Sequence, residues 1–154
     1  MTPPSLNLAR PVMDVACAAI FRGGRLLLAQ RQDNGLWELP GGKRRPSETM
    51  RQCLRREIIE ELACRLTPLA LLGLLRQRRA PGPDLALWAF GCRLIGPHEP
   101  RALEHLALRW VRPAEADGLA LCPADRLLLG LWRPPRGPIS RNCLRRLDKS
   151  PGKW

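Results

Sequence analysis

The chain has 154 residues and is 45% hydrophobic, and its 26 Lys and Arg against 14 Asp and Glu give a formal net charge of +12. A chain of this length is expected to form one domain with its own core. No run of 18 or more apolar residues occurs, and residues 1–11 lack the order of charged then apolar residues that marks a secretory signal, so we expect neither a membrane protein nor a secreted one.

The six cysteines are scattered and contain no C-x-x-C pair. This pattern argues against a zinc site and favours reduced thiols in a cytoplasmic protein. The positive charge would attract polyanions, including nucleotides, and would support weak binding of nucleic acid. The alternative is that arginine simply takes the place of lysine on an ordinary surface.

The first third of the chain predicts two paired strands. Residues 1–11 hold three prolines and are expected to form a loose arm. The apolar run 12–21 predicts a buried strand, and 26–30 predicts its hairpin partner across the turn signal Arg22-Gly23-Gly24-Arg25. A polar loop then leads to a short extended segment, 36–40, which ends at the pair Gly41-Gly42.

A helix is expected after the loop that contains Gly41-Gly42. Ser47 is the predicted N-cap, with Glu48 in the first turn and Leu62 near the end of the helix. Apolar residues recur at steps of three and four and are expected to face the core: Cys53, Leu54, Ile58 and Leu62.

The rest of the chain predicts three more strands and two more helices. The strands are expected over 66–75, 85–94 and 106–111, with a turn at 80–84. Short helices are expected over 113–116 and 123–132. Residues 133–154 are rich in Arg and Pro and are expected to be a disordered tail. Residues 12–132 would then form one α+β domain.

Three carboxylates on the predicted helix suggest a cation site. Glu57, Glu60 and Glu61 stand at i, i+3 and i+4, which places them within about one turn of each other on one helix face. Like charges at this spacing repel, and a divalent cation between them would remove the repulsion. Magnesium suits such oxygen ligands. The alternative is an acidic helix face that is simply solvated.

The residues around these glutamates resemble the box of the Nudix hydrolase family, G-x5-E-x7-R-E-U-x-E-E-x-G-U, where U is aliphatic. The matching residues are Gly42, Glu48, Arg56, Glu57, Ile58, Glu60 and Glu61. Ala63 replaces the glycine of the family, and Cys64 replaces an aliphatic residue. If the position of Ala63 requires a left-handed backbone, alanine costs about 1 kcal/mol there.

The resemblance implies an α/β/α sandwich with a mixed sheet, a catalytic helix and a C-terminal helix. It also implies Mg²⁺, or Mn²⁺, bound by Glu57, Glu60, Glu61 and the backbone carbonyl of Gly41. One glutamate, Glu57 or Glu60, would serve as or orient the general base. Gly42, Glu48 and Arg56 would be structural, with Glu48 paired to Arg56.

Segments outside the box resemble MutT-like nucleoside triphosphate pyrophosphohydrolases. They are 28–31, 36–43, 104–110 and 123–125. In that group a glutamate at the position of Glu104 adds a metal ligand, and residues at the positions of Arg31, Leu39 and Asp125 contact the nucleotide. Aspartate rather than asparagine at Asp125 occurs in relatives that act on CTP-like substrates. The alternatives for Glu104 and Arg31 are ordinary surface charges.

The resemblance therefore predicts hydrolysis of a nucleoside triphosphate, such as an oxidised 8-oxo-dGTP or a CTP-like nucleotide, to the monophosphate and pyrophosphate. Two alternatives remain open: a pyrophosphatase of ADP-ribose or another nucleoside diphosphate derivative, and a basic nucleic-acid-binding module.

His98 and His105 are expected on loops or on the surface, without a function. Tryptophans 37, 88 and 110 are expected in the core rather than stacked on a base.

Overall fold

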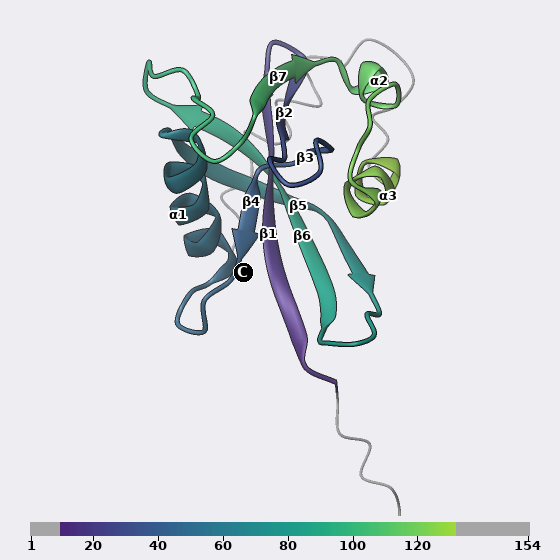
Figure 1. The fold of residues 1–154 in the computed structure, drawn as a ribbon. Helices are drawn as coiled ribbons and strands as arrows, with labels where there is room; N and C mark the ends of the chain where they lie inside the picture. Colours follow the sequence, from purple (N-terminus) through teal and green to yellow (C-terminus); the bar gives the residue numbers. More distant parts are fainter. Residues whose placement is uncertain (1–9, 132–154) are drawn as a thin grey trace, which may run out of the picture.

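The computed structural model describes residues 10–131 (Figure 1). The expected arm, apart from its last two residues, and the expected basic tail lie outside the described residues. The elements are β1 (Val12–Arg22), β2 (Arg25–Gln30), β3 (Trp37–Glu38), β4 (Gly41–Lys43), α1 (Met50–Leu62), β5 (Arg65–Gln77), β6 (Asp84–Ile95), β7 (Ala107–Val111), α2 (Pro113–Ala116) and α3 (Pro123–Leu131).

The long strand β1 runs through the middle of a mixed sheet with the strand order β3-β2-β1-β6-β5. It pairs in parallel with β6 and antiparallel with β2 and β4, while β7 pairs with the other edge of β2. In Figure 1 the helix α1 lies on one side of the sheet, and α2 and α3 lie on the other. The expected α/β/α sandwich with a mixed sheet is therefore confirmed.

Alternation along β1 explains the two packed faces. Side chains on a strand point to opposite faces in turn, so Ala16, Ala18 and Ile20 pack in the cluster that contains α1. Cys17 and Ala19 pack in the opposite cluster, which contains residues of α3. Because both faces are covered, β1 has the nearly continuous apolar sequence that predicted a buried strand.

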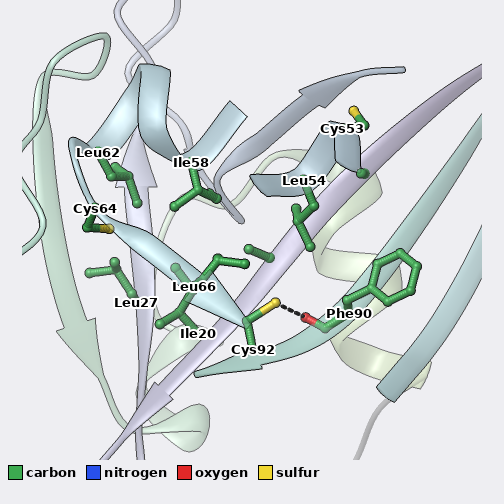
Figure 2. Packing of buried hydrophobic residues seen from close by; sticks show 12 residues of the cluster. Ile20, Leu27, Cys53, Leu54, Ile58, Leu62, Cys64, Leu66, Phe90 and Cys92 are labelled. Atoms are coloured by element: carbon green, nitrogen blue, oxygen red, sulfur yellow. Dashed lines mark hydrogen bonds between the residues drawn. The ribbon is translucent and has the colours of Figure 1, made fainter. Parts of the chain in front are cut away.

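The predicted core face of α1 is confirmed. Cys53, Leu54, Ile58 and Leu62 are each 0% exposed, and Figure 2 shows the three aliphatic side chains directed at the residues of β1, β5 and β6. Full burial of a leucine or isoleucine side chain stabilises a fold by roughly 1.5–3 kcal/mol. This packing holds α1, and the glutamates on it, against the sheet.

One edge of β1 has two partners in succession. Phe21 and Arg22 pair with β2 across the turn at Gly23-Gly24, where both glycines have positive φ, as a two-residue hairpin requires. Further back, residues 15–17 pair with β4. The strands β2 and β4 therefore separate along β1, and the functional side chains described below lie at this separation.

Two local expectations were wrong. The N-cap of α1 is Thr49 and not Ser47: the Thr49 hydroxyl accepts from the backbone N–H of Gln52, and the Gln52 side chain accepts from the Thr49 N–H. This reciprocal capping box satisfies two helix-end donors, which a cap at Ser47 would not. Glu48 consequently precedes the helix. The pair Gly41-Gly42 is also not a loop, because it forms strand β4 against β1.

The end of α1 has the left-handed backbone that the sequence analysis considered. Ala63 is the C-cap, with φ 52° and ψ 30°, and its N–H donates to the carbonyl of Ile59. Among the described residues it is the one non-glycine residue with positive φ. Alanine is strained here because its Cβ approaches the neighbouring carbonyl.

The strands and helices expected in the second half are all present. The strand β5 shifts register between Pro68 and Gly73, where proline cannot donate to the ladder. Within residues 10–131, none of the helices has the length and apolar character needed to cross a bilayer.

Candidate active site

A cavity of about 750 Å³ opens on the face of the sheet that α3 covers. Its lining comes from β1, the segment around β3 and β4, the end of α1, the loop before β7 and the start of α3. Seven of the expected site residues line it: Arg31, Leu39, Gly41, Gly42, Glu61, Glu104 and Asp125. The fold thus brings together residues that are up to 94 positions apart in the sequence.

Glu61 is the buried carboxylate of this cavity. Only 8% of the residue is exposed, and its Oε2 accepts a hydrogen bond from the backbone N–H of Gly41 at 3.0 Å. Burial raises the pKa of Glu61 to about 8, although nearby His105 and the Gly41 N–H favour the ionised form. The raised pKa means that the surrounding protein does not fully compensate the negative charge of ionised Glu61. A cation bound beside this carboxylate would lower its pKa again.

Glu57 lies against Gly42, the residue of β4 that follows the partner of Glu61. A Cβ added to Gly42 would come within 2.4 Å of the Glu57 carboxyl group, so a glycine at position 42 leaves the space that this side chain occupies. Glu57 Oε1 also accepts a hydrogen bond from Arg56 at 2.6 Å. Glu57 is not part of the cavity lining, but its charge contributes to the raised pKa of Glu61.

Glu60 departs from the expected shared carboxylate face. Its side chain is 43% exposed and approaches Arg56 at 3.1 Å and Arg45 at 3.6 Å. It does not line the cavity. Glu60 therefore shares the guanidinium of Arg56 with Glu57, but it lies outside the cavity that Glu61 lines.

Arg56 connects these carboxylates. Its guanidinium donates to Glu48, Glu57 and Glu60 and to the backbone carbonyl of Lys43. The hydrogen bonds from Arg56 lower the pKa of Glu48 to about 2. The expected pair between Glu48 and Arg56 is present, and it fastens the loop before α1 to the helix.

Asp125, from the first turn of α3, is a second buried carboxyl group in the cavity lining. Its Oδ1 accepts from the backbone N–H of Leu39 at 2.9 Å, and the residue is 4% exposed. Burial raises the pKa of Asp125 to about 7. Arg31 approaches from β2 and pairs with Glu38 at 3.0 Å and with Asp33 at 2.7 Å.

Two functional candidates escaped the sequence analysis. Glu38 was quoted in the resemblance without a role, yet it lines the cavity and contacts Arg31 and His105. His105 lies on the loop before β7, in agreement with one of the two expected places, but it is 7% exposed, and its Nε2 lies 3.4 Å from Glu38 Oε1. Glu38 and neighbouring charges raise the pKa of His105. Sequence spacing does not indicate this contact, because β2 and β3 bring Glu38 and His105 together only after folding.

The second histidine and three of the tryptophans lie outside the cavity. His98 is exposed on a loop, as expected. Trp37, Trp88 and Trp110 are partly buried and pack against the two cores. None of the three lines the cavity.

The donor set around Gly41 fits a hard divalent cation. Glu61 and Glu57 supply carboxylate oxygens beside Gly41 and Gly42, and Glu104 supplies another at the cavity wall. Atoms of Glu38, Cys122 and Asp125 also lie within 4.8 Å of one another. Burial raises the pKa of Cys122 to about 11, so this thiol is neutral at pH 7 and a poor metal ligand.

Comparison with known families and sequences agrees with this arrangement. The model of the NUDIX domain matches residues 11–132. A protein from Mycobacterium tuberculosis whose name proposes 8-oxo-dGTP diphosphatase activity is 41% identical over 116 residues, which are 73% of this chain and 82% of the relative. The CTP pyrophosphohydrolase of Escherichia coli is 39% identical over 128 residues, which are 77% of this chain and 89% of the relative.

Two solved structures are also similar to this chain. The Escherichia coli ORF135 protein superposes with a TM-score of 0.71 and 38% identity, over 79% of this chain and 89% of that one. A MutT NUDIX hydrolase from Burkholderia pseudomallei superposes with a TM-score of 0.69 and 32% identity, over 79% of this chain and 98% of that one.

Proposed function

Because the chain belongs to the NUDIX family and is a hydrolase of nucleotide pyrophosphate bonds, we propose that it converts a nucleoside triphosphate to the monophosphate and pyrophosphate. The observation that carries this proposal is one cavity lined both by the buried Glu61, bonded to Gly41, and by the buried Asp125, bonded to Leu39. Glu61 and Gly41 suit a metal-bound phosphate chain, and Asp125 suits a nucleobase.

Enzymes of this family use a divalent metal, and we propose Mg²⁺, with Mn²⁺ as a substitute. Glu57, Glu61 and the Gly41 backbone would hold it, and Glu104 would add an oxygen from the cavity wall. The bound cation would neutralise charge on the phosphates. Glu60 would have to leave Arg45 and Arg56 to join this set.

We assign the proton transfer to a glutamate of α1. An ionised carboxylate can accept a proton from the attacking water, and Glu57 is held in place for this role by its hydrogen bond from Arg56. Arg56 is itself held by Glu48. Glu60 is the alternative base, since it shares the same arginine.

Arg31, Leu39 and Asp125 would contact the nucleotide. The Leu39 N–H is fixed by Asp125, and Arg31 is fixed by Glu38. In its ionised form the Asp125 carboxylate only accepts hydrogen bonds, so it would favour a base edge that presents an amino group. The name of the Escherichia coli relative supports a CTP-like substrate, and that of the Mycobacterium tuberculosis relative supports an oxidised guanine nucleotide.

A panel of nucleotides assayed with Mg²⁺ tests the proposal. It would contain ordinary, oxidised and methylated triphosphates together with ADP-ribose. Release of pyrophosphate from a triphosphate is the expected result. Release of AMP from ADP-ribose alone would instead show a nucleoside diphosphate derivative as substrate. Salt-sensitive binding of RNA or DNA with no hydrolysis of any nucleotide would favour the nucleic-acid-binding alternative.

A further inference from the structure

The cavity extends beyond the carboxylates to a second, cationic end. Its floor continues along β1 through Val15 and Met13, which pair with Leu87 and Leu85 of β6. Met13 stands four positions before Cys17, which pairs with Gly41, and four steps of extended strand span about 13 Å. The apolar floor therefore leads away from the proposed metal site.

The cationic end is formed by side chains that face no carboxylate. Arg79 follows the end of β5, and Lys43 ends β4; both line the cavity and are exposed. Within residues 10–131, the side chains of Arg79 and Lys43 make no hydrogen bond or ion pair with another residue. Arg31, the other arginine in the cavity lining, is instead paired with Asp33 and Glu38. Charges without a protein partner at a cavity rim are available for an anionic ligand.

Arg10 holds the turn that carries Arg79. Its guanidinium donates to the backbone carbonyls of Arg79 and Gly82 and pairs with Asp84 at 3.0 Å. The backbone N–H of Asp84 also donates to the carbonyl of Pro11 at 2.9 Å. The segment before β1 therefore clasps the turn between β5 and β6, which Figure 1 shows beside the start of β1. Without Arg10 these backbone carbonyls would lose their donors, and the turn would be free to move.

We propose that Arg79 binds the third phosphate group of the substrate, counted from the nucleoside, and that Arg10 is a positioning residue that sets Arg79 at the cavity. This inference rests on the proposed function and names a determinant of its substrate class. With the base beside Asp125 and the metal beside Gly41, two points of the nucleotide are fixed. The phosphate chain then continues along the apolar floor toward Arg79. Arginine suits this position because its planar guanidinium matches phosphate oxygens in pairs.

The first test compares a triphosphate with the matching diphosphate in Arg79→Gln. The KM of the triphosphate is expected to rise about tenfold, the scale of one lost charge-assisted contact, with little change in kcat. The Ki of the diphosphate, measured as a competitive inhibitor, is expected to stay the same because it lacks the third phosphate. Arg25→Gln, which removes the same charge at the distant turn between β1 and β2, is the matched control.

The second test uses Arg10→Ala alone and combined with Arg79→Gln. Arg10→Ala is expected to raise the KM of the triphosphate by less than Arg79→Gln does, and to have no further effect when Arg79 is already replaced. This non-additivity would not arise from a general loss of stability. Arg22→Ala removes another exposed arginine–carboxylate pair, that with Glu99, and serves as the control for a lost surface ion pair.

The outcomes separate the two proposals. If the wild-type protein releases no pyrophosphate from any triphosphate, the proposed function fails. If it does, but Arg79→Gln changes the triphosphate and the diphosphate equally or changes neither, then the assignment of Arg79 is overturned. Additive effects of the two substitutions would overturn the role of Arg10 alone.

Discussion

The carboxylate of Glu61 and the backbone N–H of Gly41 are joined by a 3.0 Å hydrogen bond between the end of α1 and the start of β4. Glu61→Gln keeps an acceptor for this N–H but removes the charge that would bind a cation. We expect pyrophosphate release to fall at least 100-fold, with the far-UV circular dichroism spectrum unchanged. Glu99→Gln, at an exposed ion pair far from the cavity, is the control, and an equal loss there would contradict the role of Glu61.

Glu57 and Glu60 should differ in their effects on turnover. Glu57 faces Gly42 beside β4, whereas Glu60 is 43% exposed and faces Arg45. Glu57→Gln is therefore expected to lower kcat by orders of magnitude, and Glu60→Gln to lower it less. Steady-state kinetics at saturating Mg²⁺ would measure both. Equal losses would mean that Glu60 turns toward the metal site when substrate binds.

The stability of the metal-free protein should depend on pH through Glu61. Burial raises the pKa of Glu61 from 4.5 to about 8 in the folded chain, so the folded state favours the protonated carboxyl. This contribution is present below pH 4.5 and is lost as the pH rises toward 8. In chelator, the free energy of unfolding should fall across this window, at up to about 1.4 kcal/mol per pH unit.

Urea unfolding of wild type and Glu61→Gln at pH 5, 6, 7 and 8 would isolate this effect. The variant should show a shallower decline, because only Asp125 and His105, whose pKa values are also raised, continue to contribute in the same direction. Mg²⁺ should flatten the wild-type curve and leave the variant unchanged. Parallel curves for the two proteins in chelator would contradict a raised pKa at Glu61.

Ala63→Gly should stabilise the protein. Ala63 has a left-handed backbone with φ 52°, where glycine carries no steric penalty, and the free energy of unfolding is expected to rise by about 0.5–1 kcal/mol. Chemical denaturation would measure the change. The same substitution at Ala124, in the first turn of α3, should destabilise by a similar amount because the backbone is right-handed there. A loss of stability at position 63 would contradict the assigned strain.

Asp125→Asn should change which base is preferred more than it changes the rate of hydrolysis. Asparagine can still accept the Leu39 N–H, which Asp125 Oδ1 now accepts at 2.9 Å, but it replaces one acceptor oxygen with a donor. The ranking of kcat/KM across cytosine, guanine and 8-oxoguanine triphosphates is expected to alter. An unchanged ranking would show that Asp125 only fastens Leu39 to α3.

Local patterns in the sequence predicted much of the fold. The apolar run of β1, the helical spacing of Leu54, Ile58 and Leu62, and the glycine pair of the first turn each depend on neighbours within a few residues. Such features follow from periodicity and spacing alone.

The misses have a common physical origin in contacts between distant segments. Gly41 and Gly42 form a strand only because residues 15–17 offer an edge, and Glu38 and His105 meet across 67 positions. The N-cap was misplaced because two candidate hydroxyls, Ser47 and Thr49, stand two residues apart, and the choice depended on the side chain of Gln52.

The parallel pairing of β1 with β6 constrains how this enzyme can be made. Val12 aligns with Asp84, so the first strand cannot gain its long-range partner until more than half of the chain has left the ribosome. Until then its apolar residues remain a hazard for aggregation, because parallel pairing between distant segments is slow to form. Fragments that end before Asp84 should therefore neither fold nor bind metal, and expression yield should respond more to chaperone supply than to substitutions around the cavity.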